Sequence, residues 1–199
     1  MSDLFQEKSE TYDTNERIKK RSTAIGECIL KNVALNKQMH ILDFGAGTGL
    51  ISTQIAPYVR KITAVDISES MLQKLISKPE LKGVVKVLCH DLTTTPTGEK
   101  YDLIISAMSL HHIEDTNNLI KQFSAHLKEG GKIALSDLDT EPGTFHTPGS
   151  EGIFHFGFDR HELSQILMMN SFENIQFFTA YNEIKEDFLY PIFLVVATK

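Results

Sequence analysis

Short apolar runs alternate along the chain with longer segments whose apolar residues recur at helical spacing. A first helix over residues 15–33 is predicted by small or apolar residues at that spacing, which are Ile18, Ser22, Ile25, Ile29 and Val33. Apolar runs then predict strands at 39–44, 61–66, 84–89, 101–107 and 132–139. Helical patterns occupy 48–59, 68–77 and 117–128, and Gly130 and Gly131 follow the last one, where a helix commonly ends.

The predicted strands are almost continuously apolar, which indicates that both faces of their sheet are buried. Strands of this kind that alternate with helices are typical of a parallel sheet. We therefore predict an α/β fold: a Rossmann-like, doubly wound, mostly parallel seven-stranded sheet with helices on both faces. Two further apolar segments, 173–181 and 190–199, are expected to form a C-terminal antiparallel strand pair. We interpret residues 1–199 as a single domain.

Residues 139–158 interrupt the alternation of strands and helices. The segment has four glycines, two prolines and several phenylalanines, which predict a long loop, and loops of this length are usually functional. We expect this loop on the substrate side. Phe154, Phe156 and Phe158 alternate in it, which fits either an aromatic pocket or a half-buried strand. Residues 159–162 then resemble a capping box that opens a helix to about residue 170.

Charge and composition narrow the class of protein. The formal net charge of −6 would repel a nucleic acid unless a basic patch were present, and the basic run Arg17–Arg21 fits a solvated helix face better. Cys28 and Cys89 are too few for a disulfide framework or a zinc site. The polar first ten residues do not resemble a signal peptide, and no apolar stretch is long enough to span a membrane. We expect a cytoplasmic protein without a membrane segment.

A glycine-rich loop follows the first predicted strand. Gly45, Gly47 and Gly49 give the pattern G-x-G-x-G, whereas the dinucleotide fingerprint is G-x-G-x-x-G and would require a glycine in place of Leu50. No G-K-[ST] follows, so the loop is not a phosphate loop either. Asp43 stands two residues before Gly45. A carboxylate there would repel a pyrophosphate but would suit a ligand with an ammonium and a sulfonium group.

Five motifs in order resemble those of the class I S-adenosylmethionine-dependent methyltransferases. They are "DFGAGTG", "AVDIS", "CHDL", "YDLIISAMSLHHIED" and "LKEGGKIALSDLD", each at the end of a predicted strand, and together they cover nearly the whole chain. The segment "LHHIED" is similar to the small-molecule, ubiquinone-biosynthesis-like branch of that family. The resemblance implies S-adenosylmethionine as cofactor.

The resemblance also implies a role for each matching residue. Glycine-loop backbone would hold the methionyl part, Asp43 its ammonium, and Asp66 the ribose hydroxyls. Asp91 would accept from the adenine amino group, and Leu92 would offer a backbone N–H. The complete set of implied cofactor residues is Tyr12, Asp43, Gly45, Ala46, Gly47, Asp66, Ile67, Met71, Asp91, Leu92, Ser106 and Ala107. Plainer roles stay open for some of them: a helix cap for Asp66, a turn for Asp91, and core packing for Ile67 and Met71.

Histidines are the candidate catalytic residues. His111 and His112 follow the fourth predicted strand, and His155 lies in the 139–158 loop. A histidine can act as a base at neutral pH, although each could equally be a cavity wall or a helix start. A metal site from these histidines and His146 matches no known ligand spacing, so we expect no metal. Residues 1–34 resemble the lid and first helix of this branch, with Tyr12 over the cofactor.

These inferences favour an enzyme that transfers the methyl group of S-adenosylmethionine to a small molecule by in-line displacement. Two alternatives are a non-catalytic cofactor-binding partner or sensor and, less favoured, an NAD-binding oxidoreductase. The Asn/Asp-Pro-Pro-aromatic motif of base methyltransferases is absent, which argues against a nucleic-acid partner. The acceptor, the use of a general base, and the choice between monomer and homodimer stay open.

Overall fold

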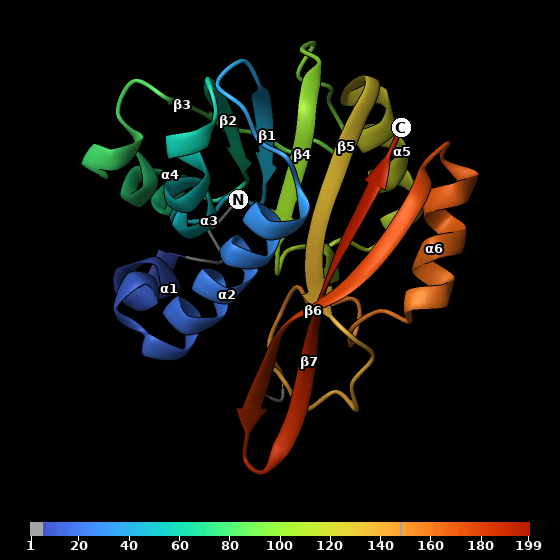
Figure 1. Ribbon diagram of the computed structural model, residues 1–199. Helices are drawn as coiled ribbons and strands as arrows, with labels where there is room; N and C mark the ends of the chain where they lie inside the picture. The colour runs from blue at the N-terminus through green and yellow to red at the C-terminus, as the bar shows by residue number, and fades with distance from the viewer. Residues whose placement is uncertain (1–5, 148) are drawn as a thin grey trace.

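The computed structural model describes residues 6–147 and 149–199 and arranges its seven strands in one sheet (Figure 1). The strand order is β3-β2-β1-β4-β5-β7-β6. Strands β1 to β5 run parallel, and β7 is antiparallel to both β5 and β6, so the predicted sheet and its C-terminal antiparallel pair are confirmed. The strands are β1 His40–Phe44, β2 Lys61–Asp66, β3 Val85–Cys89, β4 Tyr101–Ala107, β5 Leu127–Leu138, β6 Glu173–Lys185 and β7 Phe188–Thr198.

Helices cover both faces of the sheet. Side chains from α2, α3 and α4 pack on one face, and those from α5 and α6 pack on the other. Among the described helices, none is long and apolar enough to cross a membrane. The helices and 3-10 turns are α1 Gln6–Thr11, η1 Tyr12–Thr14, α2 Glu16–Asn32, α3 Leu50–Ile55, η2 Ala56–Tyr58, α4 Glu69–Ile76, η3 Pro79–Leu81, η4 Leu110–His112, α5 Thr116–His126 and α6 Arg160–Met169.

Two hydrophobic cores explain why the central strands are apolar at consecutive positions. Successive side chains of a strand point to opposite faces. In β1, Ile41 packs with the α2–α4 layer and Leu42 with the α5–α6 layer. In β4, Leu103 and Ile105 join the first core while Ile104 joins the second. A strand buried on both sides therefore has no polar alternation in its sequence.

The predicted boundary between α5 and β5 is wrong. The sequence pattern extended the helix to Lys128 and treated Gly130 and Gly131 as its stop, but α5 ends at His126 and β5 begins at Leu127. Leu127 already pairs with Tyr101 of β4, and the register then shifts so that Lys132 pairs with Leu103. The two glycines therefore lie within an irregularity of the strand. The boundary between α5 and β5 is set by the pairing of Leu127 with β4, and the helical periodicity of the sequence does not show that pairing.

The predicted helix over 48–59 is shorter than expected. Helix α3 covers Leu50–Ile55, and the 3-10 turn η2 takes over from Ala56 to Tyr58. Pro57 lies in that turn, where its ring and missing N–H do not favour a continuing α-helix. The first helix, by contrast, runs over Glu16–Asn32 with Asn15 as its N-cap, close to its predicted range.

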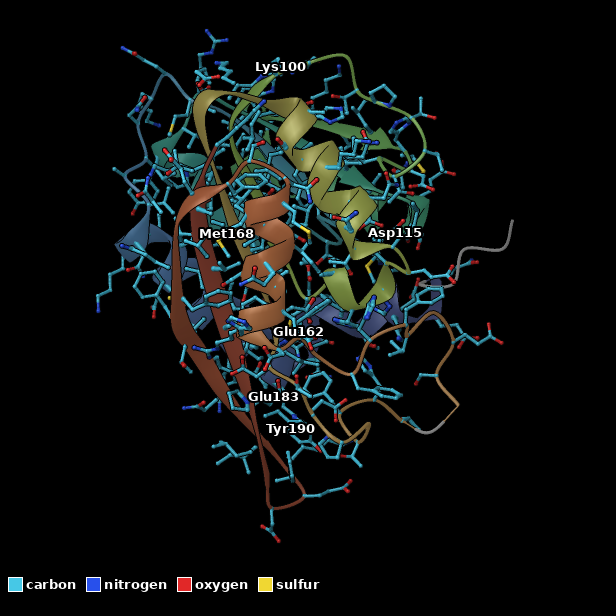
Figure 2. All side chains as sticks on the ribbon, turned by 90° about the vertical axis from the view of Figure 1, so that its right-hand side faces the viewer. Lys100, Asp115, Glu162, Met168, Glu183 and Tyr190 are labelled. Carbon is cyan, nitrogen blue, oxygen red and sulfur yellow. The ribbon has the colours of Figure 1, made fainter. Side chains whose placement is uncertain are left out.

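The segment 139–158 forms a loop whose two ends are joined, and it runs past Tyr190 of the β6–β7 hairpin (Figure 2). Asp139 and Phe158 form a bridge, and Glu141 N donates to Phe156 O at 2.9 Å. In the described part of this loop there is no strand. Phe158 is buried in the second core, whereas Phe154 and Phe156 are 53% and 56% exposed. The half-buried strand considered for these phenylalanines is therefore not formed.

Gly157 is required where the loop closes, and its substitution tests the closure. Its φ is +79°, and a Cβ atom would lie 2.1 Å from the carbonyl oxygen of Asp139. We expect Gly157→Ala to lower the free energy of unfolding by more than about 2 kcal/mol, because the clash with backbone adds to the strain of a positive φ. Gly98→Ala is the matched control, since φ is +73° there but no atom lies within 4 Å. Equal losses in urea unfolding would contradict this account.

Candidate active site

Two cavities meet above the carboxyl ends of the parallel strands. The first, of about 390 Å³, lies between the N-terminal helices, the glycine loop and η4. The second, of about 460 Å³, lies beside the ends of β2 and β3. Gly45, Asp66, Ser109 and His112 line both cavities, so the two form one continuous groove. Such a groove beyond the strand ends is where ligands bind in open parallel sheets.

The three loop glycines have different surroundings. A Cβ atom on Gly45 would lie 2.2 Å from Ser109 Oγ, and one on Gly49 would lie 2.7 Å from Leu75 Cγ. At Gly47 nothing lies within 4 Å of that position. Gly45 and Gly49 are therefore needed for packing inside the protein, and Gly47 leaves open space on the cavity side. Of the three glycines, Gly47 is therefore the one whose backbone a ligand could approach closely.

Asp66, at the end of β2, joins the glycine loop to the next helix. Its Oδ2 accepts from Gly47 N at 2.8 Å and its Oδ1 accepts from Ser68 N at 2.9 Å. The N-cap of α4 is Ser68, whose hydroxyl accepts from Met71 N at 3.2 Å, so Asp66 does not hold the cap position. Because Asp66 also lines both cavities, it lies where the two cavities meet.

Asp43 is a buried carboxyl on the wall of the first cavity. It is 2% exposed, and Ser52 Oγ donates to its Oδ2 at 2.6 Å. Burial raises the pKa of Asp43 to about 7, and the nearby Asp66 charge acts in the same direction, although the Ser52 hydrogen bond opposes it. A cationic group bound beside Asp43 would favour its ionised form.

The N-terminal segment covers the first cavity and is attached to the glycine loop. Lys8 and Tyr12 line the cavity, and Asp13 accepts from Thr48 Oγ1 at 2.5 Å while pairing with Lys78 of α4 at 2.7 Å. Burial raises the pKa of the Tyr12 phenol, against the opposing effect of Arg21. Residues 1–5 of the predicted lid lie outside the described residues.

Arg21 was not selected from the sequence, yet it lines the first cavity. Its side chain is buried, Nη1 donates to Glu183 Oε2 at 2.9 Å, and its guanidinium lies 5.6 Å from the centre of the Phe145 ring. Arg17 binds the other oxygen of Glu183 at 2.8 Å but does not line the cavity. Helical spacing gave a signal, because Arg21 falls on the stripe of Ile18 and Ile25, three residues after one and four before the other.

The second cavity contains the residues expected around adenine. Ile67, Asp91 and Leu92 line it, and Ile67 is 62% exposed there. The Asp91 carboxylate accepts from the backbone N–H and the hydroxyl of Thr93, at 2.9 and 2.6 Å, so it also shapes a turn. Met71 is buried and lines the first cavity instead, on the far side of Asp66. Ile67 and Met71 therefore lie in different halves of the groove.

The end of β4 turns sharply into the groove. Ala107 lines the first cavity, whereas Ser106 is buried in the sheet and is not among the lining residues. Met108 has a φ of 57° and lines the cavity together with Ser109. Ser109 Oγ donates to Gly45 O at 3.2 Å, which attaches this turn to the glycine loop. The two residues after the predicted pair thus contribute more to the wall than Ser106.

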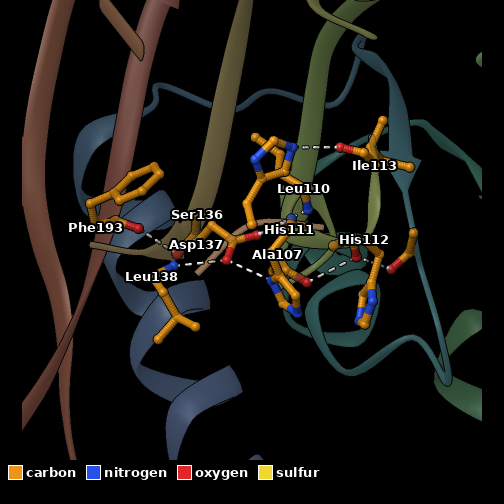
Figure 3. A network of polar contacts seen from close by, with 12 residues as sticks. Ala107, Leu110, His111, His112, Ile113, Ser136, Asp137, Leu138 and Phe193 are labelled. Atoms are coloured by element: carbon orange, nitrogen blue, oxygen red, sulfur yellow. Dashed lines mark hydrogen bonds and ion pairs between the residues drawn. The ribbon is translucent and has the colours of Figure 1, made fainter. Parts of the chain in front are cut away.

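His111 and Asp137 form a buried pair, and His111 lines the first cavity (Figure 3). His111 Nδ1 donates to Asp137 Oδ1 at 2.7 Å, and the carboxylate also accepts backbone N–H groups from Leu110 and Leu138 at 2.9 and 2.8 Å. Burial would raise the pKa of Asp137, but His111 and these donors hold it below its usual range. The Nδ1 proton of the imidazole is therefore directed to Asp137, and in the neutral ring the lone pair is on Nε2.

The other histidines differ in their contacts. His112 lines both cavities and donates from Nδ1 to Gly152 O at 2.6 Å; burial, with His111 nearby, lowers its pKa to about 4. His155 lies outside the lining of both cavities, with Nε2 2.9 Å from Ile113 O and 3.2 Å from Thr116 Oγ1. His146 lines the first cavity, with ring centres 4.9 Å from His111 and 6.1 Å from His112. Within residues 6–147 and 149–199, no cluster of three or more His, Cys, Asp or Glu is arranged to hold a metal ion.

Sequence comparison identifies the family. Residues 17–183 match the family described as "Methyltransferase domain". The chain belongs to this methyltransferase family. The family and the fold are those of the class I S-adenosylmethionine-dependent methyltransferases, whose cofactor is S-adenosylmethionine.

Individual relatives match the chain only at low sequence identity or over part of its length. The chain is 31% identical over 105 residues to ubiquinone biosynthesis O-methyltransferase of Coxiella burnetii, covering 52% of this chain and 45% of the relative. The chain thus spans about half the length of the curated relatives it matches. A solved complex of the Haloferax volcanii Trm112 methyltransferase activator with a putative methyltransferase has a TM-score of 0.80 at 13% identity, covering 100% and 98% of the two chains. Haemonchus contortus phosphoethanolamine N-methyltransferase 2 with S-adenosyl-L-methionine has a TM-score of 0.71 at 16% identity, covering 98% and 60%. These structures share the fold.

The raised pKa of Asp43 gives a stability prediction. The folded protein keeps this proton up to about pH 7, whereas an ordinary carboxyl loses it near 3.8, so the native state binds more protons between these values. Its stability therefore falls as pH rises from about 4 to about 7. We expect Asp43→Asn without ligand to melt several degrees above the parent at about pH 8, with the difference vanishing toward pH 4. Calorimetry across this range measures it.

Asp102→Asn is the matched contrast for Asp43→Asn. Burial would raise the pKa of Asp102, but His40 N–H and Lys128 hold it below its usual value, so this variant is expected to be less stable than the parent at neutral pH. The Asp43 account fails if Asp43→Asn is no more stable than the parent at pH 8.

Proposed function

We propose that this chain transfers the methyl group of S-adenosylmethionine to a small-molecule acceptor, with His111 as the general base. The observation that carries the proposal is the continuous groove, whose lining combines acidic and glycine-loop residues with His111, the partner of Asp137. A methyl donor bound across Asp66 would point its sulfonium toward the end of β4. The names of the Coxiella and Haemonchus relatives, which refer to ubiquinone biosynthesis and phosphoethanolamine, support a small acceptor.

The charges of the groove match those of the donor. Asp66 would bind the ribose hydroxyls, and Ile67, Asp91 and Leu92 would surround the adenine in the second cavity. Asp43 would take the ammonium group, since a buried carboxylate with a raised pKa gains from a cationic partner. Arg21 would meet the carboxylate of the methionyl part, and Tyr12 would cover it. The donor's opposite charges would then each face an opposite charge of the protein.

The acceptor end is suited to removing a proton. Methyl transfer forms a bond from the acceptor atom to the methyl carbon as the bond from carbon to sulfur breaks. The sulfur leaves as a neutral thioether, so the protein mainly positions the groups, and a base is needed only if the acceptor carries a proton. His111 Nε2 would accept that proton, and Asp137 would stabilise the resulting imidazolium.

The other candidate histidines have less suitable contacts for this role. The low pKa of His112, about 4, makes its imidazole a weak base at neutral pH. Because it lines both cavities, it is suited to form a wall beside the donor. His155 is held by Ile113 and Thr116, and we assign it to anchoring the loop after η4.

A cofactor-binding partner or sensor without catalysis is the main alternative. Both functions need the donor residues, so the His111–Asp137 pair is the feature that separates them. Screening small acceptors with labelled S-adenosylmethionine tests the proposal. Tight binding of the donor without transfer to any acceptor would favour the sensor.

Asp66→Ala tests the donor site. A hydrogen bond to a charged group contributes roughly 1.5–3 kcal/mol, so we expect the affinity for S-adenosylhomocysteine to fall about ten- to a hundredfold. Titration calorimetry measures the affinity. Asp66→Asn keeps an oxygen acceptor for the loop N–H groups and should fall between the parent and Asp66→Ala. An unchanged affinity in Asp66→Ala would sink the assignment.

His111→Asn tests the base. The asparagine amide can still donate to Asp137, but it has no atom in place of Nε2. Once an acceptor has been found, we expect kcat to fall roughly a hundred- to ten-thousandfold, while S-adenosylhomocysteine binds within about threefold of the parent. His161→Asn, on the exposed side of α6, is the control. A kcat within a few-fold of the parent would rule out His111 as the base.

A further inference from the structure

His146 extends the acceptor end beyond the His111–Asp137 pair. Its ring lies 4.9 Å from that of His111 and 5.1 Å from that of Phe145, and all three residues line the first cavity. Among the described residues, His111 Nε2 and His146 Nε2 are both buried and have no hydrogen-bond partner. Two neighbouring imidazoles thus each leave one nitrogen unsatisfied at the same wall.

The backbone that carries His146 is held in place. Glu141 accepts from Thr144 N and Phe145 N at 2.8 and 3.2 Å, and Lys185 donates to the carbonyl oxygens of the same two residues at 3.0 and 3.2 Å. Thr144 Oγ1 lies 2.7 Å from Tyr190 OH. Thr144 and Phe145, directly before His146, are therefore held in place, and the His146 side chain that follows is partly buried.

An unsatisfied buried nitrogen favours a ligand that supplies the missing partner. Leaving such a group unpaired is unfavourable, and here two of them lie on neighbouring rings. A single oxygen atom inserted between the rings would replace one ring contact by two hydrogen bonds. Burial, with His111 and His112 nearby, lowers the pKa of His146 to about 4, so its imidazole meets the ligand uncharged.

The fixed tautomer of His111 limits the chemistry of that ligand. In the neutral imidazole, His111 Nε2 can only accept, because the proton is on Nδ1 and is donated in the hydrogen bond to Asp137. A carboxylate has no proton to donate and would face this lone pair with its own. An alkylammonium would need a facing carboxylate, but the carboxylates that line the first cavity are Asp43 and Asp66, which the proposed function already assigns to the donor. A hydroxyl donates one hydrogen bond and accepts another, which fits both rings.

We propose that the acceptor is an alcohol or a phenol, and that His146 is a catalytic residue that donates from Nε2 to the reacting oxygen. This inference rests on the proposed methyl transfer. The hydroxyl proton moves to His111 Nε2 as the oxygen forms its bond to the methyl carbon and the carbon–sulfur bond breaks. The products are a methyl ether, S-adenosylhomocysteine and a proton that His111 later releases. The Nε2–H of His146 stabilises the negative charge that develops on the oxygen.

Binding of simple aromatic probes tests the inference without turnover. Phenol and benzoate are titrated into the complex with S-adenosylhomocysteine and followed by NMR. We expect phenol to bind at least tenfold more tightly than benzoate. His146→Phe keeps an aromatic ring but removes the nitrogen, and it should weaken phenol at least tenfold while the affinity for S-adenosylhomocysteine stays within about threefold. His161→Phe, on the exposed face of α6, is the matched control and should change neither affinity.

The outcomes separate this inference from the proposed function. Benzoate that binds as tightly as phenol, or phenol affinity that is unchanged in His146→Phe, overturns the assignment of a hydroxyl acceptor. Failure of phenol to bind a complex that does hold S-adenosylhomocysteine overturns it as well and leaves the donor site intact. Failure of S-adenosylhomocysteine to bind the parent protein would instead contradict the proposed function itself.

Discussion

The buried carboxylate of Asp137 is the interaction on which the geometry of the groove depends. It lies in β5, where the strand pairs with β7, and it accepts N–H groups from the turn that follows β4. This side chain therefore joins β5 to η4 and keeps a proton of His111 on Nδ1 (Figure 3). Removing it would leave several buried donors unpaired at once, which is far more costly than losing one surface contact.

The groove stores unfavourable interactions that a ligand can relieve. Asp43 is buried with a pKa near neutrality, and two imidazole nitrogens lack partners among the described residues. A donor with an ammonium group and an acceptor with a hydroxyl would satisfy these atoms, so binding would add stability that the empty groove lacks. Arg21 differs from these groups because it already has a partner. Its buried guanidinium lies at the cavity wall and is paired with the carboxylate of Glu183 from β6.

Local pattern predicted the fold well because burial of both sheet faces leaves a clear signal. The strands 61–66 and 101–107 have the bounds that the apolar runs gave. The glycine loop was also located correctly, but its glycines serve different needs: Gly45 and Gly49 fit against Ser109 and Leu75, and Gly47 leaves open space. The end of α5 was misplaced because Leu127 pairs with Tyr101, a contact between residues far apart in the sequence.

The sequence by itself determined the order of elements, the family and the acidic residues at the strand ends, because these depend on composition and on spacing within one segment. Only the tertiary structure decided which histidine meets Asp137, that His146 rather than His155 lines the first cavity, and that Arg21 lies at its wall. Adjacent residues of a 3-10 turn point in different directions, and a loop's side chains are placed by contacts with distant strands. The spacing of residues in the sequence shows neither the direction of a side chain in such a turn nor the distant contacts of a loop.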